Sequence, residues 1–340
     1  MLYMRADMNN IIATGHIMRC LSIADAAKDM GEDTTFILAD DQASDLLKER
    51  GYQGIILNTR WNDMDSEVPI IKELAEKYRI EKMLIDSYQV TESYLRSLSE
   101  IVETFYIDDL NVLLYPVKNI ICYANYWERF NYTERYKNSR LFLGTRYVPL
   151  RKEFGVCEEK EICSQVKKIL LLSGGADKYH ILGQILNRLN LEKYMQIDVI
   201  CGRFDAQYDE LKEVESMKGN VKVYRAVSDI KRYMEEADLV ISAGGTTLYE
   251  LCAVGTPSIS YSIADNQLEN VKKFHEDGII DYAGDVRKDN VLENIERYLR
   301  MYHSDQKIRK EKSIKMQKLV DGKGAWRIAK VITDDCRRNT

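Results

Sequence analysis

Histidine and proline are scarce in this chain, and its cysteines follow no pattern. The 340 residues include 4 histidines, 4 prolines and 7 cysteines. An odd cysteine count without a Cys-x-x-Cys pair argues against a disulfide framework and against a cysteine-rich zinc site. We therefore expect reduced thiols in the core and no metal ligands among them.

Long apolar runs and an excess of basic charge are also absent. No stretch approaches the roughly 18 apolar residues that a membrane helix needs, and the first residues lack the pattern of a secretory leader. The net charge is −5, with lysine and arginine spread along the chain, which excludes an extended basic surface for nucleic acid. These absences predict a cytoplasmic protein with no membrane span and no nucleic-acid partner, and they leave its oligomeric state open.

What the chain does contain is an alternation of short β-branched runs with helical patterns, which occurs twice. This alternation is typical of βα units around a parallel sheet, and 340 residues exceed what one core usually holds. We expect an α/β fold with two doubly wound Rossmann-like domains that face a cleft, residues 1–150 and 151–340. The final helix, Ile308 to about Cys336, either completes the second domain or crosses back to the first. The expected strands are Leu2–Arg5, Thr34–Leu38, Ile55–Leu57, Lys82–Ile85, Thr104–Ile107, Asn119–Cys122, Lys168–Leu172, Ile197–Cys201, Val221–Tyr224, Leu239–Ser242 and Ser258–Ser262.

The best catalytic candidate is His16, which lies where the loop after the first strand turns into a helix. The apolar residues that follow recur at helical spacing, and His16 precedes them in the first turn. The positive end of the helix dipole favours the neutral imidazole, and a neutral imidazole can accept a proton near pH 7. His16 is therefore a candidate general base. The alternative is a histidine that only caps the helix or bonds a carbonyl.

Two glycine-rich turns connect strands to helices in the second half of the chain. Ser173-Gly174-Gly175 follows one strand, and Ala243-Gly244-Gly245-Thr246-Thr247 follows another. Glycines admit a close ligand, and a helix start offers N–H donors to a diphosphate. Neither turn has the spacing of a dinucleotide or P-loop motif, and each could be a plain connection. Glu250 could bind ribose hydroxyls or only complement the helix dipole. We assign nucleotide binding to Gly174, Gly175, Val227, Gly244, Gly245, Thr246, Thr247 and Glu250.

Polar side chains also follow other strands at their carboxyl ends, where doubly wound sheets bind ligands. Asp86-Ser87-Tyr88 and Asp108-Asp109 follow strands of the first half, and Asp265-Asn266-Gln267 follows a strand of the second. Turn formation is the simpler role for Asp108, and ligand binding is favoured for Asp109. An adjacent aspartate pair is a poor metal site, so we expect a metal-independent reaction without cofactor. We also expect Ser228 to cap the helix after the strand that ends at Tyr224.

The order of these motifs carries a resemblance. The chain resembles the UDP-sugar hydrolases of pseudaminic acid biosynthesis and the related spore-coat polysaccharide biosynthesis proteins, which are similar to GT-B glycosyltransferases. Two positions depart from that pattern: Ala13 stands where the family often has glycine, and Ser87 where some members have histidine. The matching segments, which fall between about residue 3 and residue 285, are Arg5–Asp7, Gly15–Arg19, Asp86–Tyr88, Ile107–Asp109, Leu150–Phe154, Ser173–Asp177, Gly244–Glu250 and Asn266–Gln267.

The resemblance implies a hydrolase that releases UDP from a diacetamido-trideoxy hexose by attack of water at the anomeric carbon. His16 matches the general base of that family, Tyr88 and Asn266 match residues of the sugar and diphosphate site, and Glu250 matches the ribose-binding glutamate. Two alternatives remain open: a GT-B glycosyltransferase that uses the same donor, and a nucleotide-sugar-binding protein without catalysis. The residues expected to bind the substrate are Asp7, Gly15, Tyr88, Asp109, Asn266 and Gln267.

Overall fold

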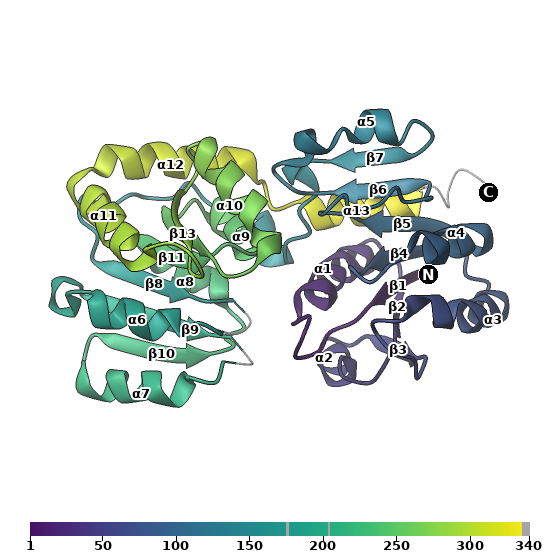
Figure 1. The fold of residues 1–340 in the computed structure, drawn as a ribbon, viewed down its shortest axis with the longest axis horizontal. Coiled ribbons are helices and arrows are strands. Elements are labelled where there is room, and N and C mark those ends of the chain that lie inside the picture. Colours follow the sequence, from purple (N-terminus) through teal and green to yellow (C-terminus); the bar gives the residue numbers. More distant parts are fainter. Residues whose placement is uncertain (175–176, 203–204, 335–340) are drawn as a thin grey trace. The chain divides into compact units, whose positions relative to one another are not determined.

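A computed structural model of the protein describes residues 1–174, 177–202 and 205–334. The chain forms two compact units (Figure 1). The first unit combines Met1–Lys152 with Gly322–Thr340, and the second unit is Glu153–Asp321. Among the described residues, no helix has the length and apolar character needed to cross a membrane.

The first unit is built on a seven-stranded parallel sheet of order β3-β2-β1-β4-β5-β6-β7. The chain starts on an interior strand of this sheet and builds outward in both directions, so β1 is buried along its whole length. The order reverses between β1 and β4, where Ala6 is in register with Asp86. The strands are β1 (Leu2–Ala6), β2 (Thr34–Leu38), β3 (Gln53–Ile56), β4 (Lys82–Asp86), β5 (Glu103–Ile107), β6 (Asn119–Cys122) and β7 (Arg140–Leu143).

The second unit repeats this plan with a six-stranded parallel sheet of order β10-β9-β8-β11-β12-β13. Its order reverses between β8 and β11, where Leu172 is in register with Ser242. The strands are β8 (Lys168–Leu172), β9 (Gln196–Cys201), β10 (Val221–Arg225), β11 (Leu239–Ala243), β12 (Ser258–Ser262) and β13 (Asp281–Asp285).

Helices connect the strands and cover both sheets. Their apolar stripes form the two cores; α1, for example, buries Ile17, Cys20, Leu21 and Ala24. The α-helices are α1 (Gly15–Asp29), α2 (Ser44–Glu49), α3 (Val68–Tyr78), α4 (Glu92–Ile101), α5 (Tyr132–Arg135), α6 (Ile181–Arg188), α7 (Tyr208–Met217), α8 (Ile230–Glu236), α9 (Thr247–Val254), α10 (Asp265–Glu276), α11 (Val291–Ser304), α12 (Gln306–Leu319) and α13 (Gly324–Asp334).

Every strand expected from the sequence is present, with its ends within two residues of the expected ones. The sequence did not predict β7 and β13. The short strand β7 lies at the edge of its sheet with every residue at least partly exposed, and β13 has the sequence Asp-Tyr-Ala-Gly-Asp. Neither has the run of buried β-branched residues by which a central parallel strand is recognised.

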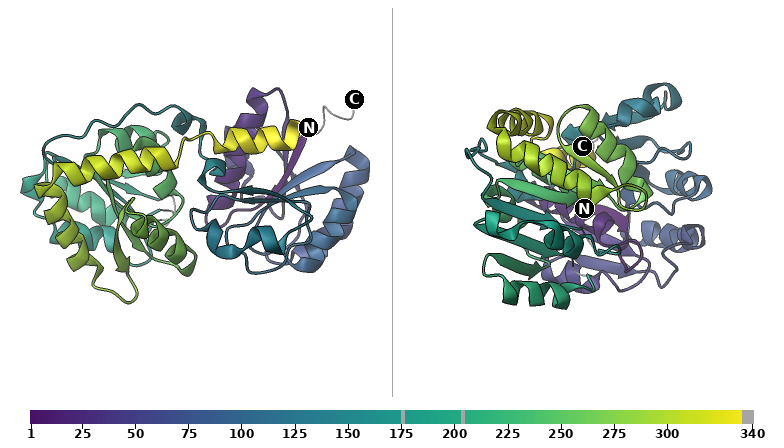
Figure 2. Two further views of the ribbon diagram at one scale, coloured as in Figure 1. Left: turned by 90° about the horizontal axis from the view of Figure 1, so that it is seen from above. Right: turned by 60° about the vertical axis from the view of Figure 1, so that its left-hand side comes forward.

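The end of the chain, Ile308 to about Cys336, was expected to be one helix that either completes the second domain or crosses back to the first. The expectation of a single helix was wrong, and the second alternative for its placement is the one observed. The segment forms two helices, α12 and α13 (Figure 2), and the break between them contains Gly322 with a φ of 68°. α13 belongs to the first unit because its apolar face packs on α1. The residues buried on that face include Ala325, Ile328, Ala329 and Ile332.

The start of α13 requires glycine. A Cβ atom at Gly324 would lie 2.1 Å from the carbonyl oxygen of Val148. We expect Gly324→Ala to lower the free energy of unfolding by about 1 to 3 kcal/mol, because backbone atoms cannot move aside as a flexible side chain does. Thermal and urea unfolding of the full chain measure this effect. Gly219→Ala is the control, since no atom lies within 4 Å of its added Cβ. Equal stability of the two variants would contradict the prediction.

Candidate functional site

The first cluster of polar residues lies where the strand order of the first unit reverses. α1 begins in the loop that follows β1, and Asp86 is the last residue of β4. Loops at such a switch point diverge to opposite faces of the sheet, which leaves room for a ligand beside the strand ends. The cluster is formed by His16, Arg19, Asp86, Tyr88, Asp109 and Tyr123.

His16 is buried in the first turn of α1, with 5% of its surface exposed. Its Nδ1 lies 2.7 Å from Oδ1 of Asp86. The ring of Tyr88 meets the imidazole edge-on, with 4.6 Å between the ring centroids. Both neighbours restrict the rotation of the imidazole ring, so this histidine is held in one orientation.

Arg19 connects the two carboxylates of the cluster. Its Nε and Nη2 donate to Oδ2 and Oδ1 of Asp86 at 2.8 and 2.6 Å, and its Nη1 lies 3.2 Å from Oδ2 of Asp109. Nη1 also donates to the hydroxyl of Tyr123. Burial alone would raise the pKa of Asp86, but the guanidinium of Arg19 and the ring of His16 outweigh burial and lower that pKa below its ordinary value. Asp86 is therefore a carboxylate at neutral pH.

Asp109 accepts hydrogen bonds through one of its two carboxylate oxygens. Oδ2 accepts from the hydroxyls of Tyr88 at 2.9 Å and Tyr123 at 3.0 Å. Oδ1 is buried and has no hydrogen-bond partner among the described residues. Burial and the Asp109 carboxylate raise the pKa of Tyr88, so its hydroxyl stays protonated and acts as a donor. Asp109 therefore has one buried acceptor atom left for a hydrogen-bond donor.

The neighbouring Asp108 shapes the turn after β5 (Glu103–Ile107). Its Oδ1 accepts from the backbone N–H groups of Leu110 and Asn111, at 3.1 and 2.8 Å. Its Oδ2 accepts from the hydroxyl of Tyr132 at 2.7 Å. Both carboxylate oxygens of Asp108 therefore accept hydrogen bonds from residues of the first unit. This agrees with the interpretation of Asp108 as a residue that forms the turn.

Asp7 and Gly15 lie near this cluster in sequence but make different contacts. Oδ2 of Asp7 accepts from Arg5 Nη1 at 2.5 Å, and Oδ1 accepts from the backbone N–H of Ala39 at 2.8 Å. These bonds give Asp7 a role in the packing of β1 against β2. Gly15 is the exposed first residue of α1. The loop before it contains Ala13 at a φ of 58°, a conformation that suits glycine better than alanine.

Of the substrate-site residues expected from the sequence, the structure brings His16, Tyr88 and Asp109 into one cluster. The sequence had assigned no roles to Arg19, Asp86 and Tyr123, which lie in the same cluster. Arg19 lies three residues after His16, so the two side chains share one helix face. Asp86 ends a strand that is otherwise apolar and buried. Those two signals were available in the sequence. Tyr123 gave none, because it is one of 22 tyrosines.

The second cluster lies in the second unit, at the start of α9. A Cβ atom at Gly244 would lie 2.0 Å from Cγ1 of Val271, so only glycine fits this turn. Its N–H donates to the carbonyl of Tyr261, and its carbonyl accepts from Nδ2 of Asn270 at 3.3 Å. Asn270, which the sequence reasoning did not identify, also accepts from the hydroxyl of Tyr249 at 2.7 Å. The loop is therefore held rigidly in front of the helix.

The remaining residues of this helix start are also placed as expected from the sequence. Gly245, Thr246 and Thr247 form the turn into α9, and within the described structure the Thr246 side chain makes no cap hydrogen bond. Glu250 lies in the first turn. Nε2 of Gln267 lies 3.9 Å from where a Cβ of Gly245 would be, which brings α10 to the same loop.

Gly174 follows β8 with a φ of 83°, and Gly175 lies outside the described residues. The helix after this loop, α6, is already capped by a carboxylate. Oδ1 and Oδ2 of Asp177 accept from the N–H groups of Ile181 and Leu182, at 3.0 and 2.8 Å. The carboxylate of Asp177 would repel a second anion at the start of α6, so the start of α9 is the better place for a diphosphate.

Three further residues of the second unit lie on loops or helix starts. Val227 is half-buried in the loop after β10, and Asn266 is exposed in the first turn of α10. Oε1 of Gln267 accepts from the N–H of Ile263 at 2.9 Å. The expectation that Ser228 caps the next helix was wrong. Asp229 takes that position, and its carboxylate accepts from the N–H of Arg232.

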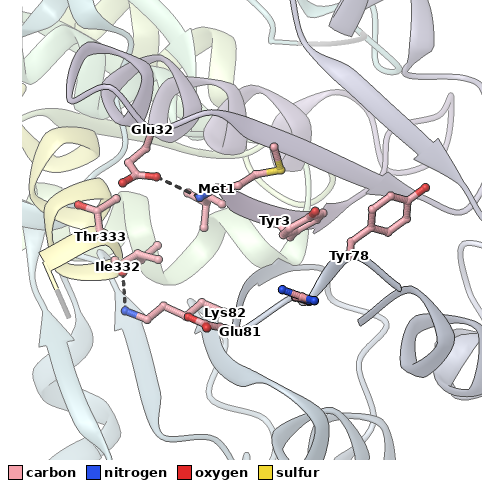
Figure 3. A pocket seen from close by; sticks show the side chains of 10 residues that line it. Met1, Tyr3, Glu32, Tyr78, Glu81, Lys82, Ile332 and Thr333 are labelled. Atoms are coloured by element: carbon pink, nitrogen blue, oxygen red, sulfur yellow. Dashed lines mark hydrogen bonds and ion pairs between the residues drawn. The ribbon is translucent and has the colours of Figure 1, made fainter. Parts of the chain in front are cut away.

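Two cavities of the described structure lie away from these two clusters. One, of about 390 Å³, lies at the amino ends of β1 and β4 (Figure 3), where Nζ of Lys82 donates to the carbonyl of Ile332 at 2.8 Å. The other, of about 460 Å³, lies between the starts of α6 and α11. Neither is lined by a residue predicted to act in the site.

The described residues contain no group of three or more histidine, cysteine or acidic side chains arranged to hold a metal ion.

The two sheets and their strand order define an α/β protein of the GT-B type, with two doubly wound domains, and confirm the expected fold class. The crystal structure of MurG from Acinetobacter baumannii superimposes with a TM-score of 0.68 at 13% identity, covering 98% of this chain and 99% of that one. The structure of Staphylococcus aureus MnaA with UDP gives a TM-score of 0.68 at 10% identity, covering 99% and 96%. At these identities the likeness shows the fold alone.

The sequence comparisons point in the same direction. Residues 169–324 match the glycosyltransferase family 28 C-terminal domain. The chain is 23% identical to the spore coat polysaccharide biosynthesis protein SpsG of Bacillus subtilis over 335 residues, which cover 94% of each chain. It spans only 57% and 52% of the lengths of two further curated relatives. The chain is thus similar to glycosyltransferases and to SpsG, and none of the proteins just named is described as a hydrolase.

Proposed function

We propose that the protein is an enzyme that displaces UDP from the anomeric carbon of a UDP-sugar, with His16 as the general base. The observation that carries this proposal is the contact between His16 and Asp86 at the switch point of the first sheet. A histidine oriented by a buried carboxylate is a common arrangement for proton abstraction from a hydroxyl group or water. The substrate is a UDP-sugar of the kind named in the resemblance, a diacetamido-trideoxy hexose.

In the proposed step, Nε2 of His16 takes the proton while the nucleophile's oxygen forms a bond to the anomeric carbon. The bond from that carbon to the diphosphate oxygen breaks, and UDP leaves with the electron pair. Oδ1 of Asp109, buried without a partner among the described residues, accepts a hydrogen bond from an N–H or O–H group of the sugar. The hydroxyl of Tyr88, held by Asp109, fixes the orientation of that carboxylate.

The second unit supplies the nucleotide site in this proposal. The N–H groups at the start of α9 and the dipole of that helix stabilise the negative charge of the leaving diphosphate. Gly244 and Gly245 admit the phosphates, Thr246 and Thr247 add hydroxyl donors, and Glu250 binds the ribose. Gly174, Gly175 and Val227 complete the nucleotide site, and Asn266 and Gln267 contact the sugar or the diphosphate.

The identity of the nucleophile separates two forms of the proposal. The similarity to glycosyltransferases favours an acceptor hydroxyl, and therefore transfer of the sugar. The order of the eight sequence motifs favours water, and therefore hydrolysis. The same base serves both reactions, since an alcohol and water each lose one proton. We take transfer as the leading form and hydrolysis as the second candidate.

A UDP-release assay separates the two forms. The full chain is incubated with UDP-N-acetylglucosamine and with UDP-linked diacetamido-trideoxy hexoses, in buffer with EDTA, with and without added sugar acceptors. Release that depends on an acceptor supports transfer, and fast release in buffer alone supports hydrolysis. Binding of UDP without release of UDP from any donor would reject both transfer and hydrolysis. It would favour the remaining alternative, a nucleotide-sugar-binding protein without catalysis.

Gly244→Ala tests the nucleotide site. The added Cβ would displace Val271 and the helix start, so we expect the Kd for UDP to rise about 10- to 100-fold, equivalent to about 1.4 to 2.8 kcal/mol. Isothermal titration calorimetry with UDP measures this. Gly183→Ala in α6 is the matched control, because its Cβ meets only Cδ2 of Leu211 at 3.9 Å. An unchanged Kd in Gly244→Ala would place the nucleotide elsewhere.

A further inference from the structure

We infer that Asp86 and Arg19 are positioning residues: together they fix the His16 tautomer that carries its proton on Nδ1 and leaves Nε2 as the proton acceptor. The inference rests on the proposed role of His16 and adds the groups that make the imidazole a base. None of these three residues is exposed by more than 6%.

The geometry around Oδ1 of Asp86 carries the argument. Nδ1 of His16 lies 2.7 Å from this oxygen, Nη2 of Arg19 lies 2.6 Å from it, and the two nitrogens are 2.8 Å apart. A carboxylate oxygen can accept from both nitrogens at once, since it has two lone pairs. Nδ1 then holds the hydrogen, and the lone pair of the neutral imidazole is on Nε2.

Arg19 determines where the carboxylate of Asp86 points. Nε and Nη2 bind both oxygens of Asp86, so the carboxylate cannot rotate away from His16. Nη1 is directed at Asp109 and Tyr123. One guanidinium thus ties together the strand ends of β4, β5 and β6, and its position on α1 sets the distance between Asp86 and the imidazole.

Charged side chains surround His16 in the cluster. Arg19 contributes one positive charge and Asp86 and Asp109 contribute two negative charges, so the cluster becomes neutral when His16 is protonated. The imidazole contacts Arg19 from α1, Asp86 at the end of β4 and Tyr88 in the loop after β4. Asp109 and Tyr123, which follow β5 and β6, contact Arg19, and the buried thiol of Cys20 lies one turn further along α1. Burial raises the pKa values of Cys20, Tyr88 and Tyr123, which keeps these three groups neutral.

The competing arrangement has Nη2 of Arg19 donating to Nδ1 of His16. Nε2 would then carry the hydrogen, and His16 could not act as a base through that atom. Nitrogen NMR of the full chain labelled with ¹⁵N-histidine distinguishes the two tautomers without any substrate. The chain has 4 histidines, and His16→Ala identifies the signals of His16. We expect Nδ1 to be protonated and Nε2 to have the shift of an unprotonated nitrogen; the reverse pattern would overturn the inference.

Asp86→Asn tests the same point through kinetics. We expect kcat to fall on the order of 10³- to 10⁴-fold with KM unchanged, as when a carboxylate that orients a catalytic imidazole becomes an amide. The acid limb of the kcat profile should move to lower pH, because the imidazolium loses its nearest anion. Arg19→Met should move the acid limb of the kcat profile to higher pH, since this substitution removes a cation beside His16. Arg19→Lys should restore the position of that limb in part.

Asp108→Asn is the control for loss of a buried carboxylate, and we expect it to retain activity with an unshifted profile. If Asp86→Asn keeps the wild-type kcat and acid limb, the positioning role is wrong. The NMR measurement keeps the two proposals separable. A wild-type protein with the Nδ1-protonated tautomer and no activity on any UDP-sugar would support the positioning role and reject only the proposed function.

Discussion

Replacement of His16 by alanine is expected to slow UDP release on the order of 10²- to 10⁴-fold, the usual contribution of a general base. The variant should bind UDP with unchanged Kd, because the proposed nucleotide site is formed by residues of the second unit. The physical reason is that neither water nor an alcohol loses its proton readily at neutral pH without an acceptor. Steady-state UDP release and calorimetry on the same preparation measure the two quantities.

His180→Asn provides the control for histidine removal. His180 is exposed at the start of α6 with a φ of 55°, a backbone conformation that asparagine tolerates. This variant should retain the wild-type rate. If His16→Ala also retained it, the base would have to be another group, or the protein would be a binder without catalysis.

Arg5→Met is expected to lower the free energy of unfolding by about 3 to 5 kcal/mol, the largest stability effect we predict. Arg5 is fully buried in β1 and binds Glu67 through two parallel hydrogen bonds, Nε to Oε1 at 2.9 Å and Nη2 to Oε2 at 3.0 Å. It also binds Asp7. Methionine fills a similar space but leaves two carboxylates buried without their cation. Urea unfolding at pH 7 measures the loss.

The pH dependence of this loss follows from Glu67. Burial raises the pKa of Glu67 even with Arg5 present, so in the wild type the cost of its ionised form disappears as the pH falls. Without Arg5 that pKa should rise further, because the attraction of the guanidinium is gone. The deficit of Arg5→Met should therefore shrink as the pH is lowered from 7 toward 5.

An exposed ion pair is the control for loss of an arginine. Arg96 pairs with Glu92 one turn away on α4, and both side chains are more than half exposed. Arg96→Met should change the free energy of unfolding by less than about 0.5 kcal/mol. If Arg5→Met and Arg96→Met were equally stable, the buried network would contribute nothing net.

The sequence predicted the sheets well, because buried parallel strands such as Lys168–Leu172 are nearly continuous apolar runs. It failed for β7, whose residues are all at least partly exposed, and for β13, whose sequence Asp-Tyr-Ala-Gly-Asp has no β-branched residue. It left the placement of α13 open, because an amphipathic sequence shows that a helix has an apolar face but not which surface that face covers. Its partner, α1, is about 300 residues earlier in the chain.

The site was predictable where one residue type implies a chemistry. His16 at a helix start and Gly244 before a helix could be singled out in this way. Arg19 and Asp86 gave weaker signals, since an arginine on a helix is usually exposed and an aspartate after a strand usually forms a turn. Only the register of Ala6 with Asp86 brings the carboxylate beside the helix that follows β1.

The return of the chain to its first unit has a practical consequence for dissection of the protein. In genetic terms, the second unit is an insertion between Lys152 and Gly322 of the first. A single fragment, Glu153–Asp321, contains the whole second unit, whereas a fragment that stops at Lys152 lacks α13 and exposes the apolar face of α1. To express the first unit by itself, Met1–Lys152 must therefore be joined to the segment that begins at Gly322 through a short linker.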